Sequence, residues 1–445
     1  MTEEGLSTEF AERVTELAQQ PVPEKTAAVA CMHLLNVIGT AIGAANHPAV
    51  QAVVDVGGQV GGQPVAPVLG RRERLDPLYA AMANGLAAHL DDYDDTHLET
   101  VIHPSAATLA AALGIAVDRG VSGRTFLTAF TLGCEVQLRA GRAISPAHYD
   151  EGWHITGTCG VLGAATAAAV VLGLDPVQLN VSWGIAASET VGHREGFGSA
   201  LKPFHVGKAA GNGLLAALLA QGGFTGSTRV FEAERGFMRV LAAEHDPAPL
   251  LDGLGSRWDL CDDVVKPYPC GIVIHPAIDA AIALSSSVPD PTRVLRIVVH
   301  CHPLVQELTG SRAPRDRLEA KFSAVHGVAA GLVDGRVGLA QYADARVADP
   351  LLAQLRSLTV LQVDDRMPRD AVRVEVERDD GERLSHQVAH ARGSLARPMT
   401  NAEVEDKVRD LVQPTLPGRT EQIIRAVEDV EAAQDLRQLV EAVVS

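Results

Sequence analysis

The stretch KPYPCGIVIHPA, residues 266–277, divides the sequence into two parts of different character. Before it, segments rich in Ala and Leu follow one another, most of them separated by Gly, Pro or Asp. They lie around residues 25–45, 76–90, 104–118, 124–142, 156–172, 177–191 and 206–221. No apolar–polar alternation long enough for a strand occurs before residue 290, so this part is predicted to be all-helical.

After this stretch, strand patterns appear. TRVLRIVVHC (292–301) and AVRVEVE (371–377) alternate like half-buried strands, and SLTVLQV (357–363) has the β-branched content of a third. Asp380-Gly381 predicts a hairpin turn into a fourth strand. A helix is predicted over 321–335, and helical segments return from residue 401.

The predicted fold class is therefore mostly α. A large all-helical domain is expected from residues 1–265 and 400–445, and a smaller α+β lid domain, residues 266–399, is inserted into it. With 445 residues, of which 47% are hydrophobic, the chain can bury a large core.

Charge and cysteine usage exclude several classes of protein. The formal net charge is −17, from 55 acidic and 38 basic residues, and this repels nucleic acid and anionic membranes. We expect neither as a partner. The six cysteines are scattered and form no C-x-x-C pair, which is typical of reduced, buried thiols. The N-terminus lacks the pattern of a secretory signal, so a cytoplasmic protein is expected.

One segment, AAVACMHLLNVIGTAIGAA (27–45), carries no formal charge and is nearly long enough to span a bilayer. It contains His33 and Asn36, and polar groups are costly in lipid. A buried helix is therefore the favoured interpretation.

The stretch HLDDYDDTHLETVIHPS (89–105) places five carboxylates and three imidazoles between apolar segments. A metal site, an acid–base site and a solvated loop all fit these residue types. The histidines lack H-x-x-x-H spacing and no second cluster completes a metal sphere, so an acid–base or structural role is favoured over a metal. In the solvated-loop alternative, Asp94 or Asp95 caps the following helix. His103 precedes Pro104-Ser105, where its ring and a helix N-terminus can face one pocket.

Further candidates lie at glycine-rich helix starts. GHREGFGSALKPFHVGKAAG (192–211) gathers basic groups, among them Lys202, in an acidic protein, which suits a carboxylated substrate. An ordinary basic loop paired with neighbouring acids is an equal alternative. His154 in GWHITGTCG (152–160) and His275 before Pro276 also precede helices, where capping or core histidines are common.

Together these segments resemble the MmgE/PrpD family. DDYDDTH…HPS, GWHITGTCGVLGAA, LKPFHVGKAAGNG, KPYPCGIVIHPA and KFSAVHGVAAGLVDG occur in the family's order. The resemblance implies a helical domain with an inserted α+β lid, a homodimer and no required cofactor or metal. Known activities in the family are 2-methylcitrate dehydratase, cis-aconitate decarboxylase and iminodisuccinate epimerase.

The resemblance also implies a set of site residues, and the shared chemistry lies at a carbon α to a carboxylate. Removing a proton there needs a base with a pKa near neutrality and donors around the substrate carboxylates. His103 and His154 are predicted to transfer protons, and Lys202 to bind a carboxylate or act as second base. The predicted substrate-binding and positioning residues are Asp92, Thr96, His275 and His326.

His326 is a departure from the family pattern. The dehydratase and decarboxylase branches usually carry a tyrosine after the K-F-S-type motif, and their chains are longer. Both points favour a cofactor-independent epimerase of an iminodisuccinate-like dicarboxylic amino acid derivative. A 2-methylcitrate-type dehydratase is the second expectation and a cis-aconitate-type decarboxylase the third. A catalytically silent polycarboxylate-binding protein is the alternative from another class, and intact His103, His154 and Lys202 argue against it.

Overall fold

A computed structural model describes residues 5–445 of the chain. The chain forms two compact units. Unit 1 comprises the residues up to Leu90, Asp94–Asp263 and Thr400–Ser445, and unit 2 comprises Asp91–Tyr93 and Val264–Met399. Each unit is described by itself. The predicted mostly α class is confirmed, because the described residues contain 21 α-helices and eight strands. The lid role of the second part stays a prediction.

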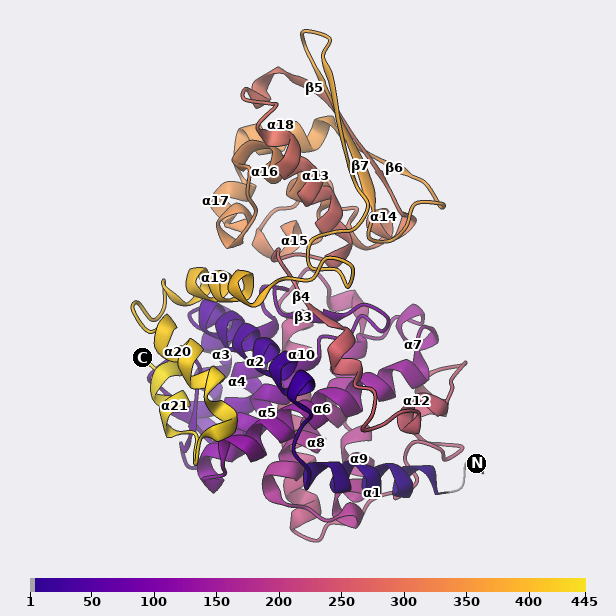
Figure 1. Cartoon of the computed structure of the whole chain (residues 1–445), viewed down its shortest axis with the longest axis vertical. Coiled ribbons are helices and arrows are strands. Elements are labelled where there is room, and N and C mark those ends of the chain that lie inside the picture. Colours follow the sequence, from indigo (N-terminus) through magenta and orange to yellow (C-terminus); the bar gives the residue numbers. More distant parts are fainter. Residues whose placement is uncertain (1–4) are drawn as a thin grey trace. The chain divides into compact units, whose positions relative to one another are not determined.

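Unit 1 is built from helices with three short strands (Figure 1). Its helices are α1 (Leu6–Ala18), α2 (Glu24–Ala44), α3 (Pro48–Val60), α4 (Pro77–His89), α5 (Pro104–Arg119), α6 (Gly123–Ile144), α7 (Ala147–Asp150), α8 (Ile155–Leu172), α9 (Pro176–Ala187), α10 (Leu201–Gln221), α11 (Phe237–Leu241), α12 (Ala248–Leu251), α19 (Asn401–Val412), α20 (Thr420–Glu428) and α21 (Arg437–Val443). Its strands are β1 (Ala66–Pro67), β2 (Arg74–Leu75) and β3 (Asp95–His97), and β4 (Asp263–Val265) spans the boundary between the units.

Small residues let the helices of unit 1 approach closely. A Cβ atom on Gly207 of α10 would lie 2.4 Å from the carbonyl oxygen of Met82 on α4. On the α4 side, a Cβ on Gly85 would lie 3.1 Å from the Cα of Gly207. The two helices therefore pack backbone against backbone, and this brings the residues at their ends together.

Helix α10 begins earlier than the sequence pattern predicts. The expected segment starts near residue 206, whereas the structure starts the helix at Leu201. Pro203 falls in the first turn, where a backbone N–H has no intrahelical acceptor, so its missing donor costs nothing. As a result Lys202 stands in the first turn of a long helix.

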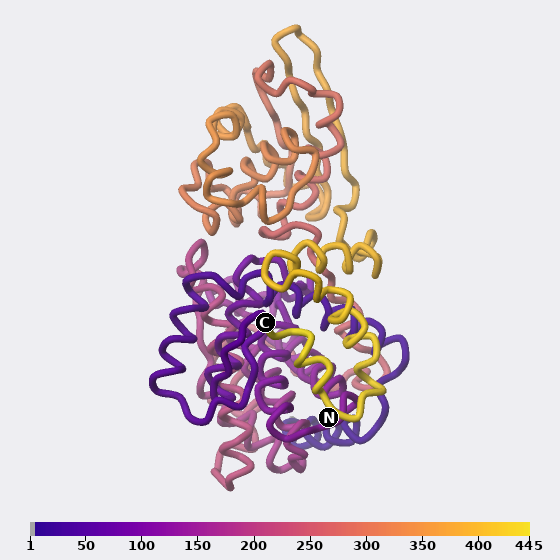
Figure 2. The backbone as a smooth tube through the Cα atoms, turned by 90° about the vertical axis from the view of Figure 1, so that its left-hand side faces the viewer, coloured from indigo at the N-terminus to yellow at the C-terminus, as the bar shows by residue number. Residues whose placement is uncertain are grey.

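Two helices, Glu24–Ala44 and Ile155–Leu172, are long and apolar enough to cross a membrane. In this structure 72% and 89% of their most apolar windows are buried inside the protein, as core helices require. On α2 the buried Asn36 accepts a hydrogen bond of 2.7 Å from Lys407 of α19. Figure 2 shows the yellow C-terminal segment lying beside the indigo N-terminal helices, and α19 packs on α2.

Unit 2 contains a four-stranded sheet of order β6–β5–β7–β8. Strands β5 (Val294–Cys301) and β6 (Thr359–Val363) are parallel, and the other pairs, with β7 (Val372–Arg378) and β8 (Arg383–Val388), are antiparallel. The helices of unit 2 are α13 (His275–Ser285), α14 (Pro303–Thr309), α15 (Arg317–Ala320), α16 (Ala324–Asp334), α17 (Asp344–Val347) and α18 (Pro350–Leu358).

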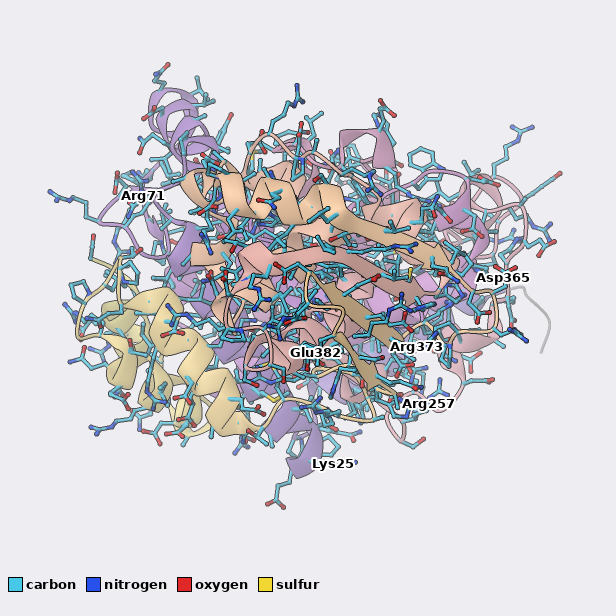
Figure 3. All side chains as sticks on the ribbon, turned by 90° about the horizontal axis from the view of Figure 1, so that it is seen from above. Lys25, Arg71, Arg257, Asp365, Arg373 and Glu382 are labelled. Carbon is cyan, nitrogen blue, oxygen red and sulfur yellow. The ribbon has the colours of Figure 1, made fainter. Side chains whose placement is uncertain are left out.

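Alternation along β7 separates the two faces of this sheet. Val372, Val374 and Val376 are buried in the core of unit 2, whereas Arg373 between them is exposed. Helix α13 contacts β7 and β8, so the core lies between helices and sheet. Arg373, and Glu382 in the turn before β8, are among the charged side chains labelled in Figure 3.

Candidate active site

Three helix N-termini of unit 1 carry the three residues predicted to be catalytic. His103 is the N-cap residue of α5 and His154 that of α8, while Lys202 is the second residue of α10. The first N–H groups of a helix lack intrahelical partners, and the helix dipole makes this end positive. Such ends favour anions, so a carboxylate is the kind of group this region can bind.

His89, the last residue of α4, lies at the centre of this group. Its Nε2 atom lies 2.9 Å from the Nζ atom of Lys202. Its ring centroid lies 4.5 Å from that of His103 and 5.8 Å from that of His154. A fourth imidazole, His205 of α10, places its Nδ1 atom 3.1 Å from Nδ1 of His154. The structure therefore brings the three predicted catalytic residues together.

Asp94 fixes the rings of two histidines. Its Oδ2 atom lies 2.7 Å from Nδ1 of His89, and its Oδ1 atom lies 3.4 Å from Nδ1 of His103. Burial raises the pKa of the Asp94 carboxyl, but His89 and His103 outweigh burial and hold the pKa well below its usual value. The carboxylate therefore accepts the Nδ1–H of His89, and Nε2 of His89 accepts a hydrogen bond from Lys202.

The Nδ1 atom of His103 has two further acceptors. It lies 2.6 Å from the main-chain carbonyl oxygen of Asp95 and 3.1 Å from the hydroxyl oxygen of Thr96. A carbonyl oxygen only accepts hydrogen bonds, so the proton of the neutral ring is on Nδ1. Nε2 is then the nitrogen that can take up a proton. Thr96 makes the contact that its predicted positioning role requires, and the role itself stays a prediction.

Burial disfavours the charged form of His89, His154 and His205. It lowers the pKa of His89 to about 4, and Asp94 opposes it only in part. Burial, with Lys202 and His89, lowers the pKa of His154 well below its usual value. Burial, with His193 and Lys202, lowers the pKa of His205 to about 4. At neutral pH these rings are therefore proton acceptors beside a lysine. Nε2 of His154 has no hydrogen-bond partner among residues 5–445.

The sequence does not single out His89, Asp94 and His205 for these roles. His89 and Asp94 stand in the acidic run, and His205 in the glycine-rich basic stretch. No spacing rule connects residue 89 to residue 202, because their contact depends on the packing of α4 against α10. Only the unusual density of imidazoles in two short stretches signals the site.

The acidic run is not a solvated loop. Asp91, Asp92, Asp94 and Asp95 are all buried, and only Glu99 is exposed. The expectation that Asp94 or Asp95 caps the next helix is also wrong, because α5 has no side-chain cap. Asp94 instead binds histidines of unit 1.

The first two aspartates of the run belong to unit 2. Asp92, predicted to bind substrate, has the left-handed φ of 50°. Its Oδ1 atom and carbonyl oxygen accept hydrogen bonds of 2.9 and 3.1 Å from buried Lys266. Asp91 pairs with Arg317, and at 3.1 Å with buried Lys321. The sequence patterns do not point to these two lysines. Both hold the segment 91–93 within unit 2.

The other two predicted substrate contacts also lie in unit 2. His275 is the first residue of α13, is buried, and its ring centroid lies 5.4 Å from that of Tyr268. His326 is fully buried, with Nε2 2.9 Å from the Gln341 carbonyl oxygen and Nδ1 3.2 Å from Arg356. Burial lowers the pKa of His326 to about 4. Both nitrogens are engaged inside unit 2, as in a core histidine, and substrate binding by His275 and His326 stays a prediction.

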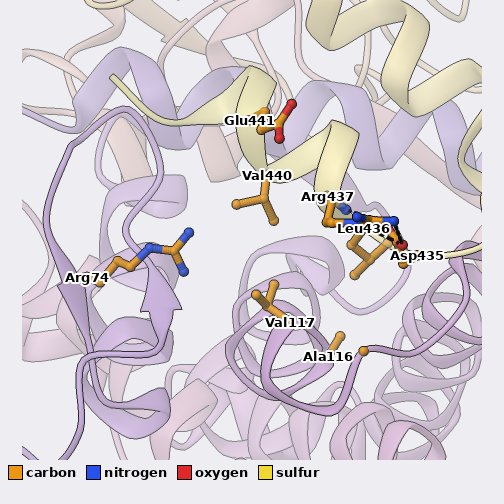
Figure 4. Close-up of a pocket in the computed structure, with 9 residues that line it drawn as sticks. Arg74, Ala116, Val117, Asp435, Leu436, Arg437, Val440 and Glu441 are labelled. Atoms are coloured by element: carbon orange, nitrogen blue, oxygen red, sulfur yellow. Dashed lines mark hydrogen bonds and ion pairs between the residues drawn. The ribbon is translucent and has the colours of Figure 1, made fainter.

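A hollow at the surface of unit 1 has a different character. It encloses about 380 Å³ between the end of α5 and helix α21, and Arg74 of β2 also lines it (Figure 4). The charged groups on its rim include Asp435 and Arg437, which pair with each other at 2.8 Å. None of the histidines described above lines it, so it is not the candidate active site.

The fold and the site define a buried acid–base centre at helix N-termini that suits an anion. The MmgE/PrpD N-terminal domain matches residues 8–250, and the MmgE/PrpD C-terminal domain matches residues 268–432. The chain therefore belongs to the MmgE/PrpD family, which confirms the resemblance seen in its motifs.

Several curated relatives are named cis-aconitate decarboxylases. Cis-aconitate decarboxylase of Homo sapiens is 30% identical over 380 residues, which cover 81% of this chain and 78% of that protein. Cis-aconitate decarboxylase of Aspergillus terreus is 26% identical over 468 residues, which cover 98% of this chain and 95% of that protein. Cis-aconitate decarboxylase of Mus musculus is 29% identical over 380 residues, which cover 81% of this chain and 77% of that protein.

Proposed function

We propose that the protein is a lyase that decarboxylates an unsaturated tricarboxylate of the cis-aconitate type. The observation that carries the proposal is the gathering of His103, His154 and Lys202 at three helix N-termini around His89. The named activity of the relatives supports it. The sequence alone favours an epimerase, and part of that preference rests on His326, which lies in the core of unit 2.

The chemistry of the substrate defines what the site must do. cis-Aconitate carries a CH2–carboxylate next to its double bond. When that carboxylate leaves as CO2, the electron pair of the broken C–C bond forms a new double bond to the central carbon. The pair of the former double bond then takes a proton at its far carbon, which is α to another carboxylate. Charge accumulates on that carboxylate before the proton arrives, so fixed donors beside it lower the barrier.

The described residues supply these functions within unit 1. Lys202 and the N-terminal N–H groups of α5 and α8 stabilise the remaining carboxylates and the charge that develops on them. His103 takes up a proton from solvent at Nε2 and delivers it to the substrate carbon, since its Nδ1 binds Asp95 and Thr96. His89 and Asp94 hold the Lys202 amine in place. A well-placed proton-transfer group typically contributes about 10²- to 10⁴-fold in rate.

Epimerisation of an iminodisuccinate-like substrate remains the second candidate. It needs proton removal on one face of a carbon and delivery on the other, hence two acid–base groups. His103 and His154 come from different helices and stand near the same central ring, that of His89. This arrangement serves either reaction, and the two differ in whether a C–C bond breaks.

Proton NMR in heavy water separates these functions, with cis-aconitate, 2-methylcitrate and iminodisuccinate stereoisomers in separate tubes. We expect CO2 release from cis-aconitate and one deuterium in the unsaturated dicarboxylate product. If deuterium enters iminodisuccinate and its stereoisomers interconvert, the protein is an epimerase and the proposed decarboxylase function is wrong. A new alkene from 2-methylcitrate alone would indicate a dehydratase. Silence in all tubes, with calorimetric binding of a polycarboxylate, would mean a non-catalytic binding protein.

The residue roles are tested with the substrate that turns over. His103→Ala is expected to lower kcat by about 10²-fold or more, because the proton donor is lost. His390→Ala, at an exposed histidine of unit 2, is the control and should leave kcat unchanged. A His103→Ala protein with wild-type kcat would contradict the assignment.

A further inference from the structure

A second polar cluster lies inside unit 1 and contains no residue assigned to the reaction. Nδ1 of His33, on α2, lies 3.2 Å from Oδ2 of Asp95 and 3.4 Å from Oδ2 of Asp263. All three side chains are 0% exposed. Two carboxyl groups and an imidazole without access to water are costly, unless they share protons with one another.

The contacts of the cluster centre on Asp95 and His33. Nδ1 of His33 faces one oxygen of each carboxyl group, and one atom from each of His33, Asp95 and Asp263 lies within 4.8 Å of the other two. The hydroxyl of Ser105 donates to Oδ2 of Asp95. Burial raises the pKa of Asp95, but the bonds from His33 and Asp263 outweigh it and the pKa lies below its usual value. The Asp95 side chain is therefore held from three directions.

The main chain of the same residue orients His103. The carbonyl oxygen of Asp95 accepts the 2.6 Å hydrogen bond from Nδ1 of His103. Ser105, which binds the Asp95 carboxylate, lies in the first turn of the helix that His103 caps. If the Asp95 side chain moves, its peptide plane turns, and the acceptor that fixes the His103 ring turns with it.

We propose that His33 and Asp263 are positioning residues for His103, and that they act through Asp95 in a buried cluster of one imidazole and two carboxyl groups. This rests on the proposed role of His103 in proton transfer. His33, on α2, and Asp263, at the start of β4, are far apart in the sequence but adjacent in the structure. The cluster therefore connects α2 and β4 with β3, the strand that begins at Asp95. The cluster fixes the orientation of the His103 ring and keeps the ring proton on Nδ1.

A bound cation is the competing explanation for the same three side chains. One imidazole nitrogen and two carboxylate oxygens within a few ångströms could hold a divalent metal ion. Metal analysis of the purified protein therefore forms part of the test.

The kinetic test uses three variants on one helix. His33→Leu fills the volume but removes the donor, whereas His33→Asn keeps a nitrogen near the position of Nδ1. Asn36→Leu is the matched control, because Asn36 is fully buried on α2 and binds Lys407 instead of Asp95. Misplacing a reacting group by about 1 Å can cost about 10²-fold in rate. We expect His33→Leu to lower kcat by about tenfold or more with KM within about twofold, and His33→Asn to recover most of the loss.

The control separates positioning from stability. Both leucine variants are expected to lower the Tm, since each leaves a buried polar group without its partner. Asn36→Leu should nevertheless retain the wild-type kcat. If His33→Leu and Asn36→Leu lose Tm alike and both retain kcat, His33 is merely structural and the proposal is overturned. Asp263→Leu should follow His33→Leu in kcat, and an unchanged kcat there would overturn the part played by Asp263.

A readout without substrate keeps this proposal separate from the proposed function. In protein labelled with ¹⁵N-histidine, the His103 Nδ1–H resonance is assigned by its loss in His103→Gln. We expect it to shift or broaden in His33→Leu and to stay in place in Asn36→Leu. An unchanged resonance in His33→Leu overturns the proposal, whether or not any substrate turns over. One zinc or manganese ion per chain, lost in His33→Leu, would overturn the proposal, because a metal ion would then hold the three side chains together.

Discussion

The Nε2 atom of His89 lies 2.9 Å from the Nζ atom of Lys202, although 113 residues separate them in the chain. His89 ends α4 and Lys202 begins α10, so the contact exists only because these two helices pack along their length. Asp94 binds the other side of the imidazole at 2.7 Å. A carboxylate, a neutral ring and an amine thus form one chain of hydrogen bonds inside unit 1.

Replacing Lys202 should impair the chemical step. Lys202→Met removes the amine that we propose binds the carboxylates of the substrate, and removal of one such electrostatic donor typically costs about 10²- to 10³-fold in kcat. Steady-state kinetics with the substrate identified by NMR measure the effect. Lys208→Met, six residues further along the same helix, is the control and should stay within about twofold of wild type. Equal effects of the two variants would mean that only the general positive charge matters.

The pKa of His89 predicts an acid limb in stability. The folded value is about 4, against the ordinary value of 6.5. Between these two pH values the unfolded chain binds more protons than the folded chain, so the free energy of unfolding falls as the pH falls. This group has no such effect above pH 6.5. At about 1.4 kcal/mol per pH unit, His89 accounts for up to about 3 kcal/mol.

Urea unfolding at several pH values between 7 and 4.5 measures this limb. His89→Asn is expected to flatten it, because asparagine does not titrate. The same substitution at the exposed His386 should leave the slope as in wild type. A slope in His89→Asn equal to that of wild type would assign the limb to other groups, such as His154 and His205.

Gly207 should be intolerant of a methyl group. In Gly207→Ala the new Cβ would lie 2.4 Å from the Met82 carbonyl oxygen, so α10 must move away from α4. Overpacking of this kind typically costs about 1–3 kcal/mol. Because α10 carries Lys202, kcat should fall as well. Thermal unfolding and steady-state kinetics of the purified variant provide both measurements.

Gly58 on α3 provides the opposite case for the same change. A Cβ there meets nothing within 4 Å, so Gly58→Ala should stabilise the helix by about 0.5–1 kcal/mol and leave kcat unaltered. A Gly207→Ala protein as stable as Gly58→Ala would show that the two helices can separate without cost, contrary to the close packing described.

The pair of Lys266 and Asp92 should matter more for stability than a pair at the surface. Both side chains are buried, and their atoms lie 2.9 Å apart. Lys266→Met removes the positive partner of a buried carboxylate, and breaking a buried pair typically costs about 3–5 kcal/mol. Chemical denaturation of the whole chain measures the loss, with attention to a separate transition of unit 2.

Arg293→Met tests the exposed counterpart. Arg293 pairs with Asp379 at 2.7 Å, and both side chains are more than a third exposed. Exposed pairs typically contribute about 0–1 kcal/mol, so little change is expected. If the two methionine variants were equally stable, Lys266 would not be needed to hold the segment 91–93 in unit 2.

Patterns local to the chain predicted much of the fold. The strand in AVRVEVE follows from alternation, because successive side chains of a strand point to opposite faces, and the structure forms β7 over Val372–Arg378. The helix starts at His103-Pro104 and at His154 follow from proline and glycine placement, which acts within one turn. The start of α10 was misplaced because Pro203 reads as a helix breaker unless it falls in the first turn.

The sequence by itself determined the mostly α class, the family and the helix starts at His103 and His154, since each depends on neighbours along the chain or on motifs in a fixed order. Only the tertiary structure decided the partners of the acidic run. Asp91 and Asp92 bind lysines of unit 2, whereas Asp94 and Asp95 bind histidines of unit 1. Sequence patterns do not distinguish the roles of carboxylates that lie within a few residues of one another. Their roles diverge because each side chain is buried beside groups that folding brings from distant segments.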